Sequence, residues 1–265
     1  KEDRTYIEML QNFFERRYMY FSYEYNLTST LQVFCDSNFE RSQWRTQFFY
    51  NHHLVKDFIQ AGCLEWIAPI MSGFIEIHHL VIAKNECQFI LISRRDKSRA
   101  GMRFVSRGCD LDGNASNSVE TEQILILNRK IPGEMKIYSF VQIRGSMPFV
   151  WAQKPNLKWS PGANFLLSQE HNTEVAKKHF DNVVKNYGSV VLVNLIDKKG
   201  TQKMLGDEFQ RVVHVANNPK VRYVWFDFHH ECRKMKYQNL SILLAQIQID
   251  IDQMGFFEAT LKKQS

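Results

Sequence analysis

The sequence predicts an α/β fold in which a mixed α+β N-terminal part precedes a part built mostly on a parallel sheet. Three observations predict it. Short β-branched runs occupy much of residues 67–93, two strand-like runs flank a Pro-Gly turn at 131–134, and apolar strands alternate with helical patterns after residue 166. We expect the two parts to divide near residue 95, giving domains 1–95 and 96–265.

In the N-terminal part, apolar side chains at Ile7 and Leu10 share one helical face of residues 4–17, which predicts a helix. The aromatic run 18–25 predicts a strand, and residues 43–59 predict a second helix. The strands expected after them lie at 75–77, 88–93, 119–128 and 135–143.

The C-terminal part reads as helices between buried strands. Asn172 or Thr173 can cap a helix that Gly188 ends. The elements expected next are a strand at 189–196, a helix at 207–217, a strand at 221–228 and a helix at 237–254 that ends at Gly255. Because strands with two apolar faces need cover on both sides, this pattern favours a parallel sheet between helix layers.

Composition and charge narrow the class of protein. The hydrophobic share of 44% indicates a folded chain, and five scattered cysteines favour reduced thiols in a cytosolic setting. The net charge of +6 suits an anionic membrane surface or a phosphorylated headgroup. Since no nucleic-acid motif is visible, we expect no nucleic-acid partner. No apolar run is long enough to span a bilayer, and the chain starts without Met, so we expect an interior piece of a longer protein.

One dense stretch, residues 94–151, places basic residues beside glycines, a pairing typical of phosphate binding. Its words are RRDKSRAGMRFVSRG, CDLDGNASNSVETEQ and SFVQIRGSMPFVW. This order of words resembles the Sac-domain phosphoinositide phosphatases. The resemblance extends to YFSYEYNLTSTLQ at 20–32, FFYNHHL at 48–54 and VRYVWFDFHHECRKMKY at 221–237, and so covers nearly the whole chain.

The resemblance implies a Sac N-terminal subdomain followed by the first part of a cysteine-phosphatase-like catalytic subdomain. It implies hydrolysis of a phosphate monoester of a phosphatidylinositol phosphate, expected to be phosphatidylinositol 4-phosphate, through a phosphocysteine intermediate. The family's Cys-x5-Arg loop belongs downstream of the segment at 221–237, so we expect no catalytic residue in this chain and no activity from it alone. The expected location is the cytosolic face of an intracellular membrane: endoplasmic reticulum, Golgi or endosome.

One literal Cys-x5-Arg pattern does occur, from Cys35 to Arg41. A loop that cradles a phosphate dianion presents backbone N–H groups and excludes negative charge. Asp36 and Glu40 lie inside this one, and it contains no glycine. We therefore interpret it as an ordinary loop.

Two short segments are candidate substrate-binding sites. Arg144, Gly145 and Ser146 follow a strand and can face a phosphoinositol headgroup, although an exposed strand end is the alternative. Asp227, His229 and His230 follow an apolar strand, and ligands of open parallel sheets bind outside the carboxyl ends of strands. The alternative there is a turn in which Asp227 caps neighbouring N–H groups.

A third candidate set is the densest basic cluster, which can contact anionic lipid or headgroup phosphates or can be a solvated sheet edge. Its members are Arg94, Arg95, Lys97, Arg99 and Arg103. We predict no cofactor and no metal. The turn Asp110–Asn114 lacks the glycine and glutamate of a calcium loop, and His229, His230 and Cys232 lack a fourth zinc ligand.

The alternative function is a non-catalytic module that binds phosphoinositide membranes or a protein partner. A nucleic-acid binder would rest on the basic charge alone. The residues that carry the Sac resemblance favour the phosphatase.

Overall fold

The structure, a computed structural model, describes residues 2–15, 18–36, 44–102, 105–128, 134–153 and 162–262. These residues form two compact units, each made of several stretches of chain. The first unit comprises residues 1–98, 118–144 and 256–265, and the second comprises 99–117 and 145–255. These units are not the same as the family subdomains that we expect to divide near residue 95, and that boundary stays a prediction.

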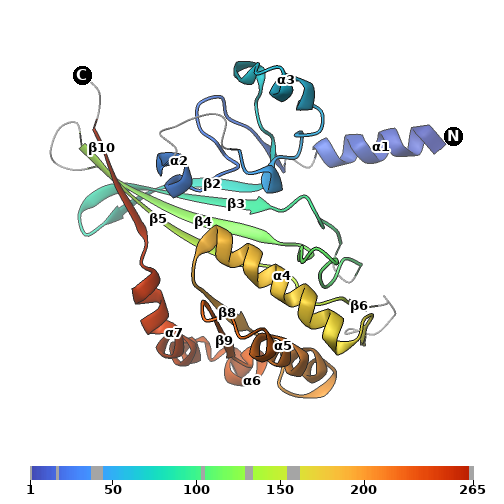
Figure 1. The fold of residues 1–265 in the computed structure, drawn as a ribbon. Coiled ribbons are helices and arrows are strands. Elements are labelled where there is room, and N and C mark those ends of the chain that lie inside the picture. Colours follow the sequence, from blue (N-terminus) through green and yellow to red (C-terminus); the bar gives the residue numbers. More distant parts are fainter. Residues whose placement is uncertain are drawn as a thin grey trace. The chain divides into compact units, whose positions relative to one another are not determined.

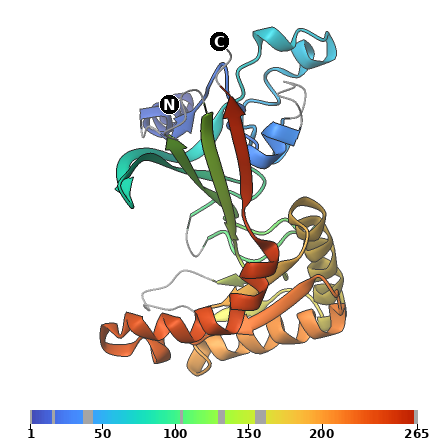
Figure 2. The same ribbon diagram turned by 90° about the vertical axis from the view of Figure 1, so that its left-hand side faces the viewer.

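The first unit is built on one antiparallel sheet with the strand order β1-β2-β3-β4-β5-β10 (Figure 1). The strands are β1 (Met19–Tyr20), β2 (Met71–Ile82), β3 (Asn85–Arg95), β4 (Val119–Asn128), β5 (Glu134–Arg144) and β10 (Phe257–Lys262). Figure 2 shows β10, in red, beside the green strands of this sheet, where Phe257 pairs with Ser139. The last strand of the chain therefore completes a sheet that begins near its start.

The same unit contains three helices and two short 3₁₀ turns among the described residues, and the described side chains of the first helix are exposed. These elements are α1 (Glu2–Glu15), α2 (Leu31–Asp36), α3 (Lys56–Gln60) and the 3₁₀ turns η1 (Thr46–Phe48) and η2 (Leu64–Trp66). The core gathers Leu27 and Leu31 against Met71, Ile92 and Ile124. Because side chains alternate across a strand, Ile92 on β3 and Ile124 on β4 lie on the buried face. Arg94, Glu120 and Glu122 share that face by the same alternation.

The second unit carries a two-stranded parallel sheet, β8 (Val190–Asn194) with β9 (Val221–Trp225), and a short antiparallel pair, β6 (Trp151–Gln153) with β7 (Ala163–Phe165). Its longer helices are α4 (Gln169–Tyr187), α5 (Lys203–Ala216) and α7 (Leu240–Met254). Shorter turns are η3 (Gly200–Gln202), α6 (Phe228–Glu231), η4 (Arg233–Met235) and η5 (Tyr237–Asn239).

Packing in the second unit follows from the apolar faces of its helices. Ala176 and Phe180 of α4 and Phe209 and Val212 of α5 pack with Phe149 in one core. Ser168 caps α4 by accepting a hydrogen bond from the His171 N–H, and Gly188 ends it at a φ of 76°. Helix α7 differs, because none of its residues is buried although most of them are apolar.

Two N-terminal predictions are wrong in detail. The expected strand at 18–25 is limited to Met19–Tyr20, because the residues after it form turns in which the Ser22 hydroxyl accepts from the Tyr25 N–H. The expected helix at 43–59 is broken into η1, a turn and α3, and Asn51 bonds instead to Ala68 and Ile70. Residue 43 and the turn residues 131–133 lie outside the described residues.

The fold class is thus mixed α and β with an antiparallel sheet in the first unit. The predicted strands at 119–128 and 135–143 are confirmed as β4 and β5. A parallel arrangement is present in β8 and β9 only, among the described residues, so the sheet there is smaller than expected. Two strands are fewer than a sheet with helices on both faces normally contains.

Candidate functional site

The carboxyl ends of β8 and β9 lie side by side because the two strands are parallel, with Asn194 opposite Trp225. The chain leaves β8 through Asp197 and Lys198, and it leaves β9 through Asp227 and His229. Side-chain contacts join the two exits. We refer to Asp197, Lys198, Asp227 and His229 as the strand-end cluster.

Asp227 is a structural anchor of this cluster. Its carboxylate accepts from the Lys198 N–H at 2.9 Å and from the His230 N–H at 3.0 Å, and it caps α6. Burial alone would raise the pKa of Asp227, but the two backbone hydrogen bonds hold the pKa below its ordinary value. The capping alternative is therefore realised, and Asp227 fixes both loops with a negative charge.

His229 presents a different geometry. Its Nδ1 lies 2.7 Å from Oδ1 of Asp197, and 74% of its side chain is exposed. A carboxylate at one ring nitrogen orients the imidazole. The other nitrogen is then available to a ligand. His230, also exposed, has its Nδ1 at 3.3 Å from Glu231 of the same short helix.

Trp225, the last residue of β9, contacts the chain that leaves β8. Its Nε1 donates to the Ile196 carbonyl at 2.9 Å, and its ring packs on Gly206 of α5, where an added Cβ would lie 2.1 Å from the ring. The Lys198 ammonium lies 5.9 Å from the centre of the ring. This contact holds a cation beside the carboxyl ends of the strands.

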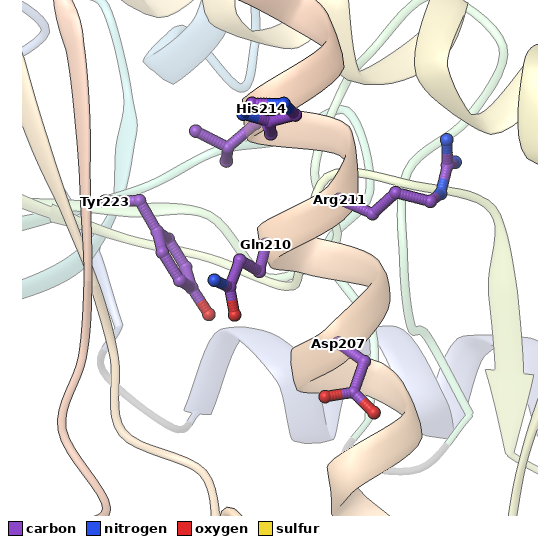
Figure 3. A pocket seen from close by; sticks show the side chains of 6 residues that line it. Asp207, Gln210, Arg211, His214 and Tyr223 are labelled. Carbon is purple, nitrogen blue, oxygen red and sulfur yellow. The ribbon is translucent and has the colours of Figure 1, made fainter.

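A groove of about 490 Å³ adjoins the cluster and is lined by Lys198, Lys203, Asp207, Gln210, Tyr223 and Trp225. A second groove of similar volume, lined by Asp207, Gln210, Arg211, Val213, His214 and Tyr223, continues along α5. Figure 3 shows Tyr223 beside Gln210, with Arg211 on the opposite side of the helix. The first groove combines two aromatic rings with two lysines, which suits a ligand that has both a ring and an anionic group.

The predicted residues Arg144, Gly145 and Ser146 have separate contacts. Arg144 is the exposed last residue of β5 and belongs to the first unit. Ser146 belongs to the second, where its hydroxyl accepts from the Gly108 N–H at 2.8 Å and its N–H donates to Ser116. Ser146 therefore fixes a loop, and the described contacts do not join this segment to the strand-end cluster.

For Arg94, the prediction of a membrane or headgroup contact is wrong. Its side chain is 0% exposed, and Nε donates to the Leu27 carbonyl at 2.6 Å. Nη1 donates to Glu120 at 2.9 Å and Nη2 to Glu122 at 2.7 Å. The physical reason is strand alternation, which turns Arg94 into the core where two carboxylates face it.

Other groups complete this buried cluster, which we call the Arg94 cluster. Arg45 forms a second ion pair with Glu120. Glu122 also accepts from the Ser139 hydroxyl at 2.6 Å and from the Leu31 N–H at 2.8 Å. These bonds tie α2 to the middle of the sheet.

The rest of the basic cluster is divided. Arg95 is half-buried at the end of β3. Lys97 is exposed but donates to the Phe49 carbonyl, and desolvation lowers its pKa. Arg99 donates to the Ser116 hydroxyl at 2.8 Å and to the Arg107 carbonyl. Arg103 lies outside the described residues. Contact of these four with lipid stays a prediction.

Two of the described thiols, those of Cys35 and Cys109, are disfavoured as nucleophiles. Burial, and next Asp36 and Glu122, raise the pKa of Cys35, which disfavours the thiolate. Arg41 lies outside the described residues. Burial also raises the pKa of Cys109 to about 12, and its thiol contacts the Gly113 carbonyl.

Sequence reasoning missed Asp197, Lys198 and the grooves. A signal for the first two existed, because they follow the apolar strand 190–194 as Asp227 follows 221–225. Among the described residues, no three metal-ligating side chains are arranged to hold an ion. None of the helices in the described ranges combines the length and the apolar character that crossing a bilayer requires.

Comparison with known proteins gives a consistent result. The family model "SacI homology domain" matches residues 1–233. A Phosphatidylinositol-3-phosphatase SAC1 from Saccharomyces cerevisiae is 35% identical over 98% of this chain and 42% of its own length. A protein of the same name from Drosophila melanogaster is 36% identical over 97% of this chain and 43% of its own length. The Phosphoinositide phosphatase SAC6 of Arabidopsis thaliana is 35% identical over 90% of this chain and 40% of its own length. The chain thus spans less than half the length of these relatives.

Proposed function

We propose a function for this chain from one premise: the chain belongs to the SacI homology domain family. The function is that of a phosphoinositide phosphatase, to which these residues contribute substrate-binding walls. The observation that carries the proposal is the family match over residues 1–233, which includes the strand-end cluster. The relatives' names state phosphatidylinositol phosphatase activity for those proteins.

The substrate we propose is a phosphatidylinositol monophosphate. The sequence resemblance led us to expect the 4-phosphate, whereas two of the relatives named above are called 3-phosphatases. The 3-phosphate and the 4-phosphate are positional isomers that have the same charge and the same size. Both isomers therefore belong in the test.

The reaction we propose is displacement at phosphorus by a cysteine thiolate. The S–P bond forms as the P–O bond to inositol breaks, and the inositol oxygen takes a proton from a general acid. Water then attacks the phosphocysteine, which releases inorganic phosphate and restores the thiolate. Positioning and charge neutralisation supply most of the barrier lowering in phosphoryl transfer.

Within this scheme the strand-end cluster is the part that faces substrate. Lys198 and His229 offer donors to an anionic headgroup, and Asp197 orients the imidazole ring. Asp227 holds the two loops together. We retain Arg144, Gly145, Ser146 and His230 as proposed headgroup contacts, and all of them except Ser146 are exposed.

We propose that the second unit is the beginning of a cysteine-phosphatase-like catalytic domain. Its support is the parallel pair β8 and β9, with the charged cluster at their carboxyl ends. We propose that the nucleophile belongs to the family's Cys-x5-Arg loop, which the resemblance places downstream of residues 221–237. Cys35, in the one Cys-x5-Arg pattern of this sequence, is disfavoured because burial raises its pKa. The proposed site of action is the cytosolic face of an intracellular membrane.

A chimera tests this function. This chain would replace the 269 aligned residues of the Saccharomyces cerevisiae relative, and phosphate release from vesicles containing either isomer would be measured. We expect release from at least one isomer, and none from the isolated chain. The substitution His229→Gln should lower release by about a hundredfold if the imidazole transfers a proton.

A folded chimera that releases no phosphate from either isomer would contradict the proposal. It would favour the alternative, a phosphoinositide- or protein-binding scaffold. Steady turnover by the isolated chain would contradict the placement of the nucleophile. The matched control is His214→Gln on α5, a histidine that lines the second groove but not the strand-end cluster.

A further inference from the structure

The hairpin of β2 and β3 has an unusual end. The strands pair from Gly73 opposite Arg94 to Ile82 opposite Asn85, and Ala83 and Lys84 alone connect them. Both connecting residues have positive φ, 50° and 66°, as a two-residue turn of this type requires. The hairpin therefore ends in a narrow point made without glycine.

Three consecutive aliphatic side chains lie beside that turn. Leu80 is 40% exposed, Val81 is 72% exposed and Ile82 is 47% exposed. Because side chains alternate along a strand, Leu80 and Ile82 point to one face of the hairpin and Val81 points to the other. Exposed aliphatic side chains on both faces of a hairpin end differ from a single uncovered face of a sheet, because they surround the end of the hairpin. We call residues 80–84 the hairpin tip.

Polar residues follow the tip on the same strand. His78 and His79 are exposed, and Nε2 of His78 lies 3.0 Å from a carboxylate oxygen of Glu76. Along β2, the run of three exposed aliphatic side chains at the end is thus followed by polar side chains at 79, 78 and 76, with the exposed Ile77 between the last two. A bilayer interface changes in the same sense, from hydrocarbon to headgroups to water.

We propose that the hairpin tip inserts into the interface of a lipid membrane. The inference rests on the proposed function, since a phosphatase of phosphoinositides meets its substrate in a bilayer. It moves the expected membrane contact from Arg94, which is buried, to an apolar element that the sequence reasoning did not single out.

The dimensions agree with shallow insertion. A strand rises about 3.3 Å per residue, so the three residues from Leu80 to the turn reach about 10 Å. Interfacial elements bury their apolar side chains to about 5–10 Å. On the partner strand, Asn85 and Glu86 are exposed and polar, which limits the tip to headgroup depth.

Two other occupants fit the pattern less well. An added strand from a second copy or another protein would pair along the edge of β2, where three of the four side chains at 76–79 are polar and Ile77 is the exception. A paired strand would need apolar contacts along the whole edge of β2, whereas the consecutive aliphatic side chains lie at its end. The charges of Lys84 and Glu86 cancel near the tip, so the apolar side chains carry the binding.

Vesicle flotation tests the tip. The vesicles would contain phosphatidylcholine with a minority of phosphatidylserine and no phosphoinositide, so that headgroup recognition does not contribute. We expect the isolated chain to bind, and binding to persist in roughly 1 M salt, where charges are screened beyond about 3 Å. The double substitution Val81→Asp with Ile82→Asp should weaken binding about tenfold or more, because two carboxylates enter an apolar layer.

Matched variants keep the test specific. Leu54→Asp alters an aliphatic side chain next to α3 that is more exposed than either tip residue, at 81%, and should leave binding unchanged. Val81→Trp should strengthen binding, because tryptophan favours the interface. Circular dichroism checks that each variant is folded, and the tryptophan variant decides the outcome if the aspartates unfold the hairpin.

Several results would overturn the inference. The first is that the parent chain does not bind vesicles. The second is that the double variant binds as well as the parent, and the third is that Leu54→Asp loses as much binding as the double variant. A dimer in light scattering that the double variant converts to monomers would assign the tip to a second copy. Failure of the proposed function is distinguishable, because an inactive chimera leaves the flotation result unchanged.

Discussion

The two charged clusters of this chain differ in how much of their bonding capacity the fold uses. In the Arg94 cluster, Arg94, Glu120 and Glu122 are all 0% exposed, and every nitrogen of the guanidinium has a partner. In the strand-end cluster, His229 and Asp197 pair near the surface, with 74% and 34% of their side chains exposed. Residue type alone does not separate structure from chemistry here. Burial and spare hydrogen-bonding capacity do.

The largest expected effect lies in the buried cluster. Replacing Arg94 by Met leaves Glu120 and Glu122 buried beside an apolar side chain. We expect the free energy of unfolding to fall by about 3–5 kcal/mol, as when one partner of a buried ion pair is removed. Chemical denaturation measures it. Arg144→Met, at an exposed strand end, should change stability by less than about 0.5 kcal/mol. A loss below that level at Arg94 would refute the distinction.

The second effect tests the support of the strand-end cluster. In Gly206→Ala the new Cβ would meet the Trp225 ring, which cannot move without losing its hydrogen bond to Ile196. We expect a loss of about 1–3 kcal/mol from overpacking. Adding Trp225→Phe, which has a smaller ring, should recover part of the loss. Equal stability of Gly206→Ala and the parent in thermal unfolding would show that the ring is free to shift.

The third effect is smaller and depends on pH. Because the pKa of Asp227 is lower in the folded chain than in the unfolded one, its stabilisation is complete above the unfolded pKa, about 4. It is lost as pH falls through the folded pKa. Asp227→Asn should therefore lower stability by about 1 kcal/mol at neutral pH and flatten the acid side of the stability curve. An unchanged acid slope would contradict this role.

The smallest effect is expected at His229. Its ring is exposed and pairs with one carboxylate, so His229→Gln should change the free energy of unfolding by less than about 0.5 kcal/mol. Denaturation of the isolated chain measures it. A change of several kcal/mol would make His229 structural and would remove the reason to expect chemistry there.

Local patterns predicted much of the fold. The helix ended by Gly188 and the strands β4 and β5 follow from spacing and turn residues. The pairing of β10 with β5 could not be predicted, because it joins residues 257–262 to 134–139 and no local signal specifies a partner so distant. The breaks in the predicted helix at 43–59 come from contacts of Asn51 with residues 68 and 70, which are tertiary.

The site was predictable in part. Strand topology singled out the segment after β9 as a candidate site, and whether it binds substrate stays a prediction. The same rule applied to the strand 190–194 would have added Asp197, and the parallel pairing of β8 with β9 shows why the two segments meet. Arg94 was wrongly predicted to contact the membrane or a headgroup, because a run of basic residues is usually exposed to solvent. Glu120 and Glu122, two positions apart and on one face of a strand with Ile124, were the available signal that a buried cation faces them.

The central claim is that the charged groups where β8 and β9 end, and not the interior arginine of the first unit, meet the phosphorylated headgroup. Amide NMR spectra of the labelled chain, titrated with soluble dioctanoyl phosphatidylinositol 4-phosphate and its 3-phosphate isomer, test it most directly. Shifts at residues 197–199 and 227–230 that disappear in Lys198→Ala are the predicted result. Saturable shifts confined to other segments, with these residues unmoved, would contradict it.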